Sequence, residues 1–302
     1  MSLLIIGGPT AVGKSEIACC VAEKLQGEII SADSMAVYKY MDIGTAKPLE
    51  CMKRVKHHLV DIVEPSGYFD AKIFEEEAKR LIEEIQRRGK VPIVVGGTYL
   101  YVQALLYGID ETPKPDWKLR EKLYALAQKK GNEFLYEKLK AVDPKYALKI
   151  HPNDLRRIVR ALEVFLLSGR PFSSYHRWDK PKLRHVGILL MRSRESLFKR
   201  IEERLKDMVK NGLLEEIKKL LEMGYERFLT SGQAIGYKEF VPCAKGEKPV
   251  EECLKEAVKN TKEQAKRQIR WFKKQGWHEI NLDEVSFEEA CRRIVEVYKA
   301  YT

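Results

Sequence analysis

Eight residues near the start of the chain have the types and the spacing of a phosphate-binding loop. The segment GPTAVGKS, residues 8–15, matches the pattern GxxxxGK[ST] and lies between the apolar run LLIIG and a helical pattern. In such a loop, backbone amides and a helix N-terminus hold two phosphates, the lysine neutralises them and the last hydroxyl reaches Mg²⁺. The pattern predicts a diphosphate or triphosphate ligand and leaves the rest of that ligand open. The residues expected to hold the phosphates are Gly8, Pro9, Thr10, Ala11, Val12, Gly13, Lys14 and Ser15, with Ser15 also a ligand of the metal.

Two further polar residues follow runs that have the character of strands. Asp33 ends the run EIISAD, and Thr98 follows KVPIVVGG. In a parallel sheet the ligand site lies at the carboxyl ends of the strands, so both side chains are expected near the phosphate loop. A carboxylate there can serve as a general base or as an indirect Mg²⁺ ligand, and a hydroxyl can stabilise charge on a leaving oxygen. The local sequence leaves a turn role for Asp33 and a helix-cap role for Thr98 as alternatives.

The first hundred residues alternate between short aliphatic runs and amphipathic helical patterns. Strand character is found in LLIIG, EIISAD, HHLVDIV and KVPIVVGG, and helical patterns begin at Lys14, at Ala71 and at about Thr98. This alternation is typical of a parallel sheet with helices on both faces. We therefore predict an α/β fold with a parallel sheet core like that of P-loop NTPases.

The middle of the chain changes to consecutive helical patterns without a convincing strand, which predicts an all-helical insertion domain at 113–184. The core domain is then formed by 1–112 and 185–302. Its second part begins with the strand pattern RHVGILLM. Helices follow from about Glu195, over Leu213 to Glu222 and near Pro249 to Lys274, before a short strand HEINL and a last helix.

The composition favours a polyanionic partner and argues against a membrane protein. The 302 residues include 55 Lys and Arg against 44 Asp and Glu, a formal charge of +11, although the heavy use of Lys and Glu can alternatively reflect heat adaptation through surface ion pairs. No apolar run approaches the roughly 18 residues of a membrane span, and no export signal is recognisable. We expect a cytoplasmic protein that does not bind membranes.

The cysteines and the paired histidines suggest no metal site. The six cysteines have neither a CxxC pair nor the spacing of zinc ligands, so reduced, incidental thiols are expected. His57 and His58 precede an apolar run without a third ligand nearby, and we expect them to be structural.

Two helical patterns have basic faces. Lys255 to Lys274 contains eight Lys and Arg against two Glu, with basic residues recurring at helical spacing. Arg156, Arg157 and Arg160 lie on one side of a second predicted helix. A solvated surface is the usual explanation for such stripes, and a contact with an RNA backbone is the alternative.

Six motifs taken together resemble, in order and spacing, the tRNA dimethylallyltransferases of bacterial type, also called tRNA isopentenyltransferases. They are GPTAVGKS, SADSMAVYKYMDIGTAKP, HHLVDIVEP, GGTYLY, NDLRRIVRALEV and SGQAIGYKEF, and the match extends to KRQIRWFK at 266–273. The resemblance implies that the phosphate loop holds the pyrophosphate of dimethylallyl diphosphate. The prenyl group would pass to the exocyclic N6 amine of the adenosine on the 3′ side of the anticodon.

The resemblance also implies roles for individual residues. Asp33 corresponds to the general base, Thr98 to the residue that assists the departing pyrophosphate, and Arg200 to a further pyrophosphate ligand, with Arg204 one turn later. The helical insertion would close over the anticodon stem-loop of the tRNA, and the protein is expected to be a monomer that uses Mg²⁺. The implied contacts with tRNA are Asp33, Ser34, Met35, Ala36, Thr98, Arg156, Arg157, Ile158, Val159, Arg160, Lys266 and Arg270.

The chain departs from the pattern of many relatives at four positions, which concern recognition of tRNA rather than the chemistry. Ala36 and Arg156 stand where glutamine is common, Tyr40 where glycine is common and Arg270 where threonine is common. Two other functions remain alternatives. A P-loop kinase could use the same loop with ATP, and a non-catalytic RNA-binding protein could retain a vestigial nucleotide site.

Overall fold

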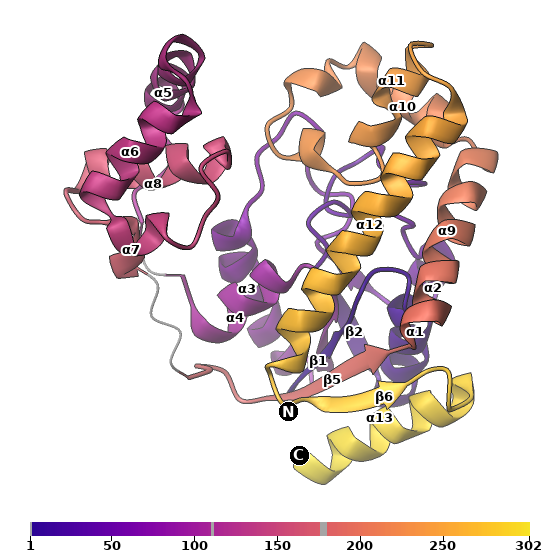
Figure 1. Ribbon diagram of the computed structural model, residues 1–302. Coiled ribbons are helices and arrows are strands. Elements are labelled where there is room, and N and C mark those ends of the chain that lie inside the picture. The colour runs from indigo at the N-terminus through magenta and orange to yellow at the C-terminus, as the bar shows by residue number, and fades with distance from the viewer. Residues whose placement is uncertain (1, 110–111, 176–179) are drawn as a thin grey trace. The chain divides into compact units, whose positions relative to one another are not determined.

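The structure, a computed structural model, describes residues 2–109, 112–175 and 180–302 (Figure 1). The chain divides into two compact units. Unit 1 is Met1–Leu106 with Leu183–Thr302, and unit 2 is Tyr107–Lys182, where the sequence pattern predicts an insertion at 113–184.

Unit 1 contains a sheet of six parallel strands in the order β3-β2-β4-β1-β5-β6. Gly7 at the end of β1 pairs with Gly96 at the end of β4, so the carboxyl ends of the central strands meet at one edge. The predicted α/β fold is confirmed. The strands are β1 (Leu3–Gly7), β2 (Gly27–Ser31), β3 (His57–His58), β4 (Val91–Gly96), β5 (His185–Met191) and β6 (His278–Asn281).

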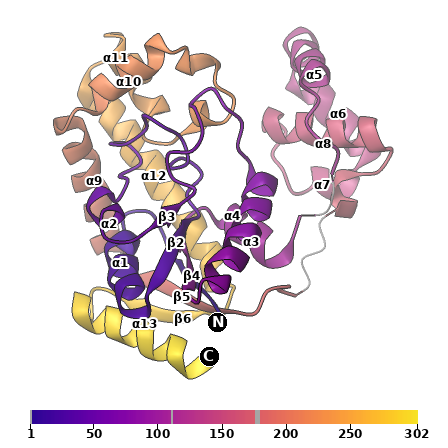
Figure 2. The ribbon, with the colours of Figure 1, turned by 180° about the vertical axis from the view of Figure 1, so that it is seen from behind.

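Helices cover both faces of this sheet. Figure 1 shows α12 (Val250–Lys273) in front of the sheet, beside α9 (Arg194–Lys210), and Figure 2 shows α1 (Lys14–Leu25) and α3 (Ala71–Arg87) on either side of β2. The central strands are buried on both faces and therefore consist of aliphatic residues. The other helices of this part of the chain are α2 (Leu49–Met52), α4 (Tyr99–Tyr107), α10 (Leu213–Glu222), α11 (Val241–Ala244) and α13 (Phe287–Tyr301).

The prediction of a strand over HHLVDIV is mostly wrong. Only His57–His58 pairs with β2, because Leu59 and Asp61 adopt left-handed backbone conformations with φ of 61° and 55°. The chain turns there, and the amides of Asp61 and Ile62 bond to the segment after β2 instead. The histidines are structural, as predicted: Nε2 of His58 lies 2.7 Å from a carboxylate oxygen of the buried Glu28.

Unit 2 contains helices and no strand among its described residues, and it has a core of its own. Its elements are α5 (Trp117–Lys130), α6 (Asn132–Val142), α7 (Pro144–Ala147), α8 (Leu155–Ser168) and a 3₁₀ turn at Phe172–Tyr175. The core gathers Leu123, Leu135, Leu139, Ile158 and Leu162 from three of these helices.

Four of the six cysteines form disulfide bonds, which corrects the expectation of reduced thiols. Cys19 pairs with Cys51, and Cys20 pairs with Cys291, so α1 is linked to α2 on one side and to α13 on the other. Neighbouring positions on a helix point about 100° apart, which lets two adjacent cysteines reach different partners. The sequence contains no signal for this, because the partners are far apart along the chain.

Candidate functional site

The phosphate loop has the strand–loop–helix context that the sequence predicts. It runs from the end of β1 to Lys14, the first residue of α1, and reaches that helix through Gly13 with φ of 109°. Two arginines hold its carbonyl groups: Nε of Arg200 donates to Ala11 at 2.9 Å, and Nε of Arg192 donates to Val12 at 3.0 Å. They stabilise the loop and add positive charge beside it. Arg192, at the end of β5, was not predicted from the sequence.

Lys14 folds back onto its own loop. Its Nζ donates to the carbonyl oxygens of Gly8 at 2.9 Å and Pro9 at 2.6 Å. The pKa of Lys14 is lowered to about 7, mainly by burial and also by the nearby Arg204, while Asp33 opposes both effects. The ammonium group therefore lacks a strong anionic partner that a bound phosphate would provide.

Asp33 lies directly after β2 and forms a turn there. Its Oδ1 accepts hydrogen bonds from the amides of Met35 at 2.8 Å and Ala36 at 3.2 Å. No hydrogen bond engages Oδ2 within residues 2–109, 112–175 and 180–302. The turn role and the chemical role, alternatives in the sequence, are therefore compatible, since each uses a different oxygen.

Thr98 lies at the end of β4 and bonds across to the segment after β2. Its Oγ1 accepts a hydrogen bond from the amide of Ser34 at 3.0 Å, and the amide of Thr98 donates to Ala32 at 3.2 Å. The hydroxyl thus contacts Ser34 instead of capping α4. Asp33 and Thr98 are held on neighbouring strand ends, as the parallel sheet predicts.

A cavity of about 490 Å³ in unit 1 brings most of the predicted residues together. The polar residues of its wall come from the phosphate loop, from both strand ends and from α9 and α12. Those predicted from the sequence are Thr10, Ala11, Gly13, Lys14, Ser15, Asp33, Ser34, Met35, Ala36, Thr98 and Arg200.

Arg204 and Gln268 also line this cavity. Burial lowers the pKa of Arg204, with Asp33 acting in the opposite direction. In the described part of the chain, its guanidinium has neither a hydrogen bond nor an ion pair. Gln268 bonds to the phosphate loop, and the sequence signal for it is a long polar side chain on the buried face of α12.

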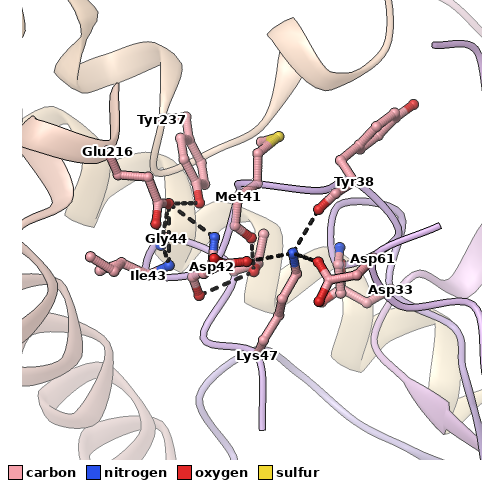
Figure 3. A network of polar contacts seen from close by, with 12 residues as sticks. Asp33, Tyr38, Met41, Asp42, Ile43, Gly44, Lys47, Asp61, Glu216 and Tyr237 are labelled. Atoms are coloured by element: carbon pink, nitrogen blue, oxygen red, sulfur yellow. Dashed lines mark hydrogen bonds and ion pairs between the residues drawn. The ribbon is translucent and has the colours of Figure 1, made fainter. Parts of the chain in front are cut away.

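A further part of the wall is formed by Gly44, Thr45, Ala46 and Lys47, which belong to the segment 41–47 (Figure 3). The buried Nζ of Lys47 donates to the carbonyl of Tyr38 at 2.6 Å, to Asp42 at 2.8 Å and to Asp61. The Glu216 carboxylate accepts hydrogen bonds from three consecutive amides of the same segment, the shortest being 2.9 Å from Ile43. These contacts fix the shape of the wall.

The five predicted tRNA residues of α8 divide by burial. Arg156 and Arg157 are exposed, whereas Ile158 and Val159 are 0% and 1% exposed and belong to the buried face of α8. Their side chains therefore cannot form the expected surface contact, and this part of the expectation is corrected. Arg160 binds the buried carboxylate of Glu163.

Arg160 also holds the segment that leads into α5. It donates to Thr112 Oγ1 and to the carbonyl of Pro113, both at 3.0 Å. Arg120 is the second cation on Glu163, at 2.9 Å. Arg160 therefore has a structural role in unit 2.

The basic face of α12 is only partly free. Lys262 pairs with Glu202 of α9, and Lys266 pairs with Glu263 at 2.5 Å, while Arg270 is exposed. The ring of Trp271 stacks on Tyr99, with 5.9 Å between ring centres, and so has a packing role.

Within the described ranges, no group of three or more His, Cys, Asp or Glu side chains is arranged to hold a metal ion. No helix of the described residues is long and apolar enough to cross a membrane.

The chain is similar to proteins of one family over nearly its whole length. The family model of IPP transferase matches residues 36–275. A tRNA dimethylallyltransferase of Aquifex aeolicus is 78% identical over 299 residues, which is 99% of this chain and 98% of that protein. A tRNA dimethylallyltransferase of Hydrogenobaculum is 54% identical over 272 residues, 90% of this chain and 91% of that protein.

Solved structures agree with these matches. The full-length tRNA isopentenylpyrophosphate transferase of Bacillus halodurans has a TM-score of 0.73 and 39% identity, covering 99% of this chain and 96% of that one. A eukaryotic dimethylallyltransferase, described as acting on tRNA, has a TM-score of 0.77 and 34% identity, covering 93% and 73%.

Proposed function

This chain belongs to the IPP transferase family, and we propose that it transfers the dimethylallyl group of dimethylallyl diphosphate to the N6 amine of the adenosine on the 3′ side of the tRNA anticodon. The observation that supports this most directly is the cavity in which the phosphate loop, Asp33 and Thr98 meet. In the reaction, N6 forms a bond to C1 of the allyl group, the C1–O bond breaks, diphosphate leaves and the amine loses a proton. No phosphoryl group moves, and the family membership argues against the kinase and the non-catalytic alternatives.

We assign the general base to Asp33. An exocyclic adenine amine is a poor nucleophile, because its lone pair is delocalised into the ring, so a carboxylate that accepts its proton assists the attack. The Met35 and Ala36 amides orient the carboxylate through Oδ1. Oδ2 is the atom left to receive the proton.

The diphosphate is held by the phosphate loop and by two arginines of α9. Lys14, Arg200 and Arg204 line the cavity beside the loop amides and can neutralise the charge that develops as the C1–O bond breaks. The Thr98 hydroxyl, oriented by the Ser34 amide, is placed to donate to the leaving diphosphate. All of these groups belong to unit 1.

The residues of the site fit a Mg²⁺ ion bound together with the donor. Mg²⁺ prefers a small number of protein oxygens supplemented by water and substrate phosphates, and the Ser15 hydroxyl at the start of α1, on the wall of the cavity, offers such an oxygen. When bound, the ion would add to the neutralisation of the diphosphate.

We propose that tRNA contacts exposed cations on both units. Arg156 and Arg157 on α8 and Arg270 on α12 are exposed, and they can bind the phosphate backbone without reading its sequence, together with the partly exposed Lys266 once it leaves Glu263. The target adenine must leave its stack to reach the cavity, as in other enzymes that modify bases. We further propose that the protein acts as a monomer in the cytoplasm, with the helical insertion closing over the anticodon stem-loop.

The test is incubation of the purified protein with Mg²⁺, unmodified tRNA and radiolabelled dimethylallyl diphosphate, followed by counting of label in the RNA. We expect label to enter only tRNA that has adenosine next to the anticodon, and no requirement for ATP. A parallel reaction with ATP in place of the prenyl donor serves as the control. Absence of label together with tRNA-independent release of phosphate from ATP would show that the proposal is wrong.

A further inference from the structure

We propose that Gln268 is a positioning residue that couples the tRNA-facing helix α12 to the phosphate loop and to the end of β4. The inference rests on the function proposed above. Gln268 is 5% exposed, and its side chain reaches from α12 to two loops of the cavity. It contacts no reacting atom directly, so its effect would pass through the groups it holds.

The two hydrogen bonds of Gln268 are complementary. The amide of Thr10 donates to Oε1 at 2.8 Å, and Nε2 donates to the carbonyl oxygen of Gly97 at 2.9 Å. One partner is a donor and the other an acceptor, so the opposite orientation of the side-chain amide would leave both bonds unmade. A single side chain therefore fixes an amide of the phosphate loop and the residue before Thr98.

The packing around Gln268 leaves little room for adjustment. A Cβ atom at Gly97 would lie 2.6 Å from Nε2 of Gln268, and one at Gly7 would lie 2.3 Å from the ring of Phe272, one turn further along α12. The helix thus rests directly on the ends of β1 and β4. A displacement of α12 must move these loops or break the two bonds.

The opposite face of the same helical turn is exposed and basic. Arg267 and Arg270 flank Gln268 in sequence and are exposed, on the surface proposed to bind the tRNA backbone. A rigid helix that contacts tRNA on one face and the phosphate loop on the other provides a physical link between the two substrates. Such a link would give a coupling free energy between the two binding sites. Bound tRNA would then strengthen the binding of diphosphate, and bound diphosphate would strengthen the binding of tRNA by the same factor.

The test compares Gln268→Met and Gln268→Glu with the wild type. Methionine keeps the length of the side chain and loses both bonds. Glutamate keeps an acceptor for Thr10 but places an oxygen against the carbonyl of Gly97. Glu256→Gln, at an exposed position three turns earlier on α12, is the matched control.

The measured quantities are kcat, the two KM values, and the affinity for inorganic diphosphate with and without a saturating anticodon stem-loop RNA. We expect kcat to fall about 10–100-fold in both variants, as for a small misplacement of reacting groups, while KM for tRNA changes little. In the wild type the RNA should strengthen diphosphate binding, and in Gln268→Met it should not. Melting curves establish that all proteins are folded at the assay temperature.

The outcomes separate this inference from the proposed function. If the wild type transfers no prenyl group, the proposed function fails whatever the variants do. If the wild type is active and Gln268→Met retains its kcat and its coupling, Gln268 is structural only and the inference is overturned. A fall in kcat with unchanged coupling would equally contradict the link through α12.

Discussion

The ammonium nitrogen of Lys14 lies 2.6 Å from the carbonyl oxygen of Pro9, within its own phosphate loop. The carbonyl group presents only a dipole to the ammonium group, whereas a phosphate would present a full negative charge. The pKa of Lys14 is lowered to about 7, mainly by burial. The group therefore loses its proton in the free protein at a pH where a free lysine is still charged.

The first prediction concerns proton uptake by Lys14. A bound diphosphate favours the charged form and raises the pKa, so at pH 8 to 9 binding should take up a proton. Calorimetry of diphosphate binding in two buffers with different ionisation enthalpies counts these protons. We expect wild type to take up about one proton more than Lys14→Met.

The sign of the stability effect follows from the same shift. The pKa is lower in the folded than in the unfolded chain, so unfolded protein binds more protons between about pH 7 and 10.5. Lys14 therefore makes the free energy of unfolding rise with pH over this interval. In the calorimetric comparison of the first prediction, equal proton uptake by wild type and Lys14→Met would contradict the proposed role of the Lys14 ammonium group in binding diphosphate.

The second prediction concerns Asp33. Asn at this position keeps an oxygen for the Met35 and Ala36 amides but cannot accept a proton from the substrate amine. We expect kcat of Asp33→Asn to fall about 10²–10⁴-fold, with tRNA affinity nearly unchanged. Single-turnover kinetics at saturating substrates, with filter binding of tRNA, checks this. If Asp33→Asn turned over at the wild-type rate, the assignment of Asp33 as the general base would be wrong.

The third prediction concerns Arg204, a cation held in the cavity without an anionic partner among the described residues. Removing its charge should leave the free protein as stable or more stable, because burial disfavours that charge. The KM for dimethylallyl diphosphate should rise about 10–100-fold, which corresponds to the free energy lost with one charge-assisted hydrogen bond. Arg204→Met is compared with Lys206→Met, at an exposed position on the same helix, by melting temperature and kinetics.

The fourth prediction concerns the disulfides of α1. Cys20–Cys291 closes most of the chain, with a separation of 271 residues, and Cys19–Cys51 closes 32. Cross-links of such length stabilise by about 2–5 kcal/mol, chiefly through the unfolded state.

Cys291→Ser should lower the melting temperature by several degrees, whereas Cys243→Ser, which breaks no bond, should change it little. Differential scanning calorimetry under non-reducing conditions makes the comparison. The same melting temperature for Cys291→Ser and wild type would indicate that the bond does not form in solution.

The sequence predicts best the features that depend on neighbours along the chain. The phosphate loop, the sheet and helices such as α10 follow from local patterns, and the strand ends explain why Asp33 and Thr98 meet. Contacts between distant segments are harder to predict. Gln268 contacts Thr10 across 258 positions, and nothing near it in sequence identifies its partner.

Charge patterns have a similar limit. Arg156 and Arg160 look alike on a helical projection, yet only the folded unit shows that Glu163 is buried beside Arg160. The pairing of Cys20 with Cys291 is a further case, since spacing along the chain bears no relation to it. Local sequence determines which groups are available, and tertiary packing determines which of them are used.

The fifth prediction distinguishes two kinds of arginine on α8. Arg156 and Arg157 are exposed, so replacing both with alanine should weaken tRNA binding and reduce the steepness of its salt dependence, with little effect on stability. Arg160→Ala removes one of the two cations on the fully buried Glu163. Breaking part of such a buried cluster should destabilise unit 2 by about 1–3 kcal/mol. Electrophoretic binding assays at several salt concentrations, together with urea unfolding, separate the two effects. If Arg160→Ala lost tRNA affinity at unchanged stability, Arg160 would belong to the tRNA surface after all.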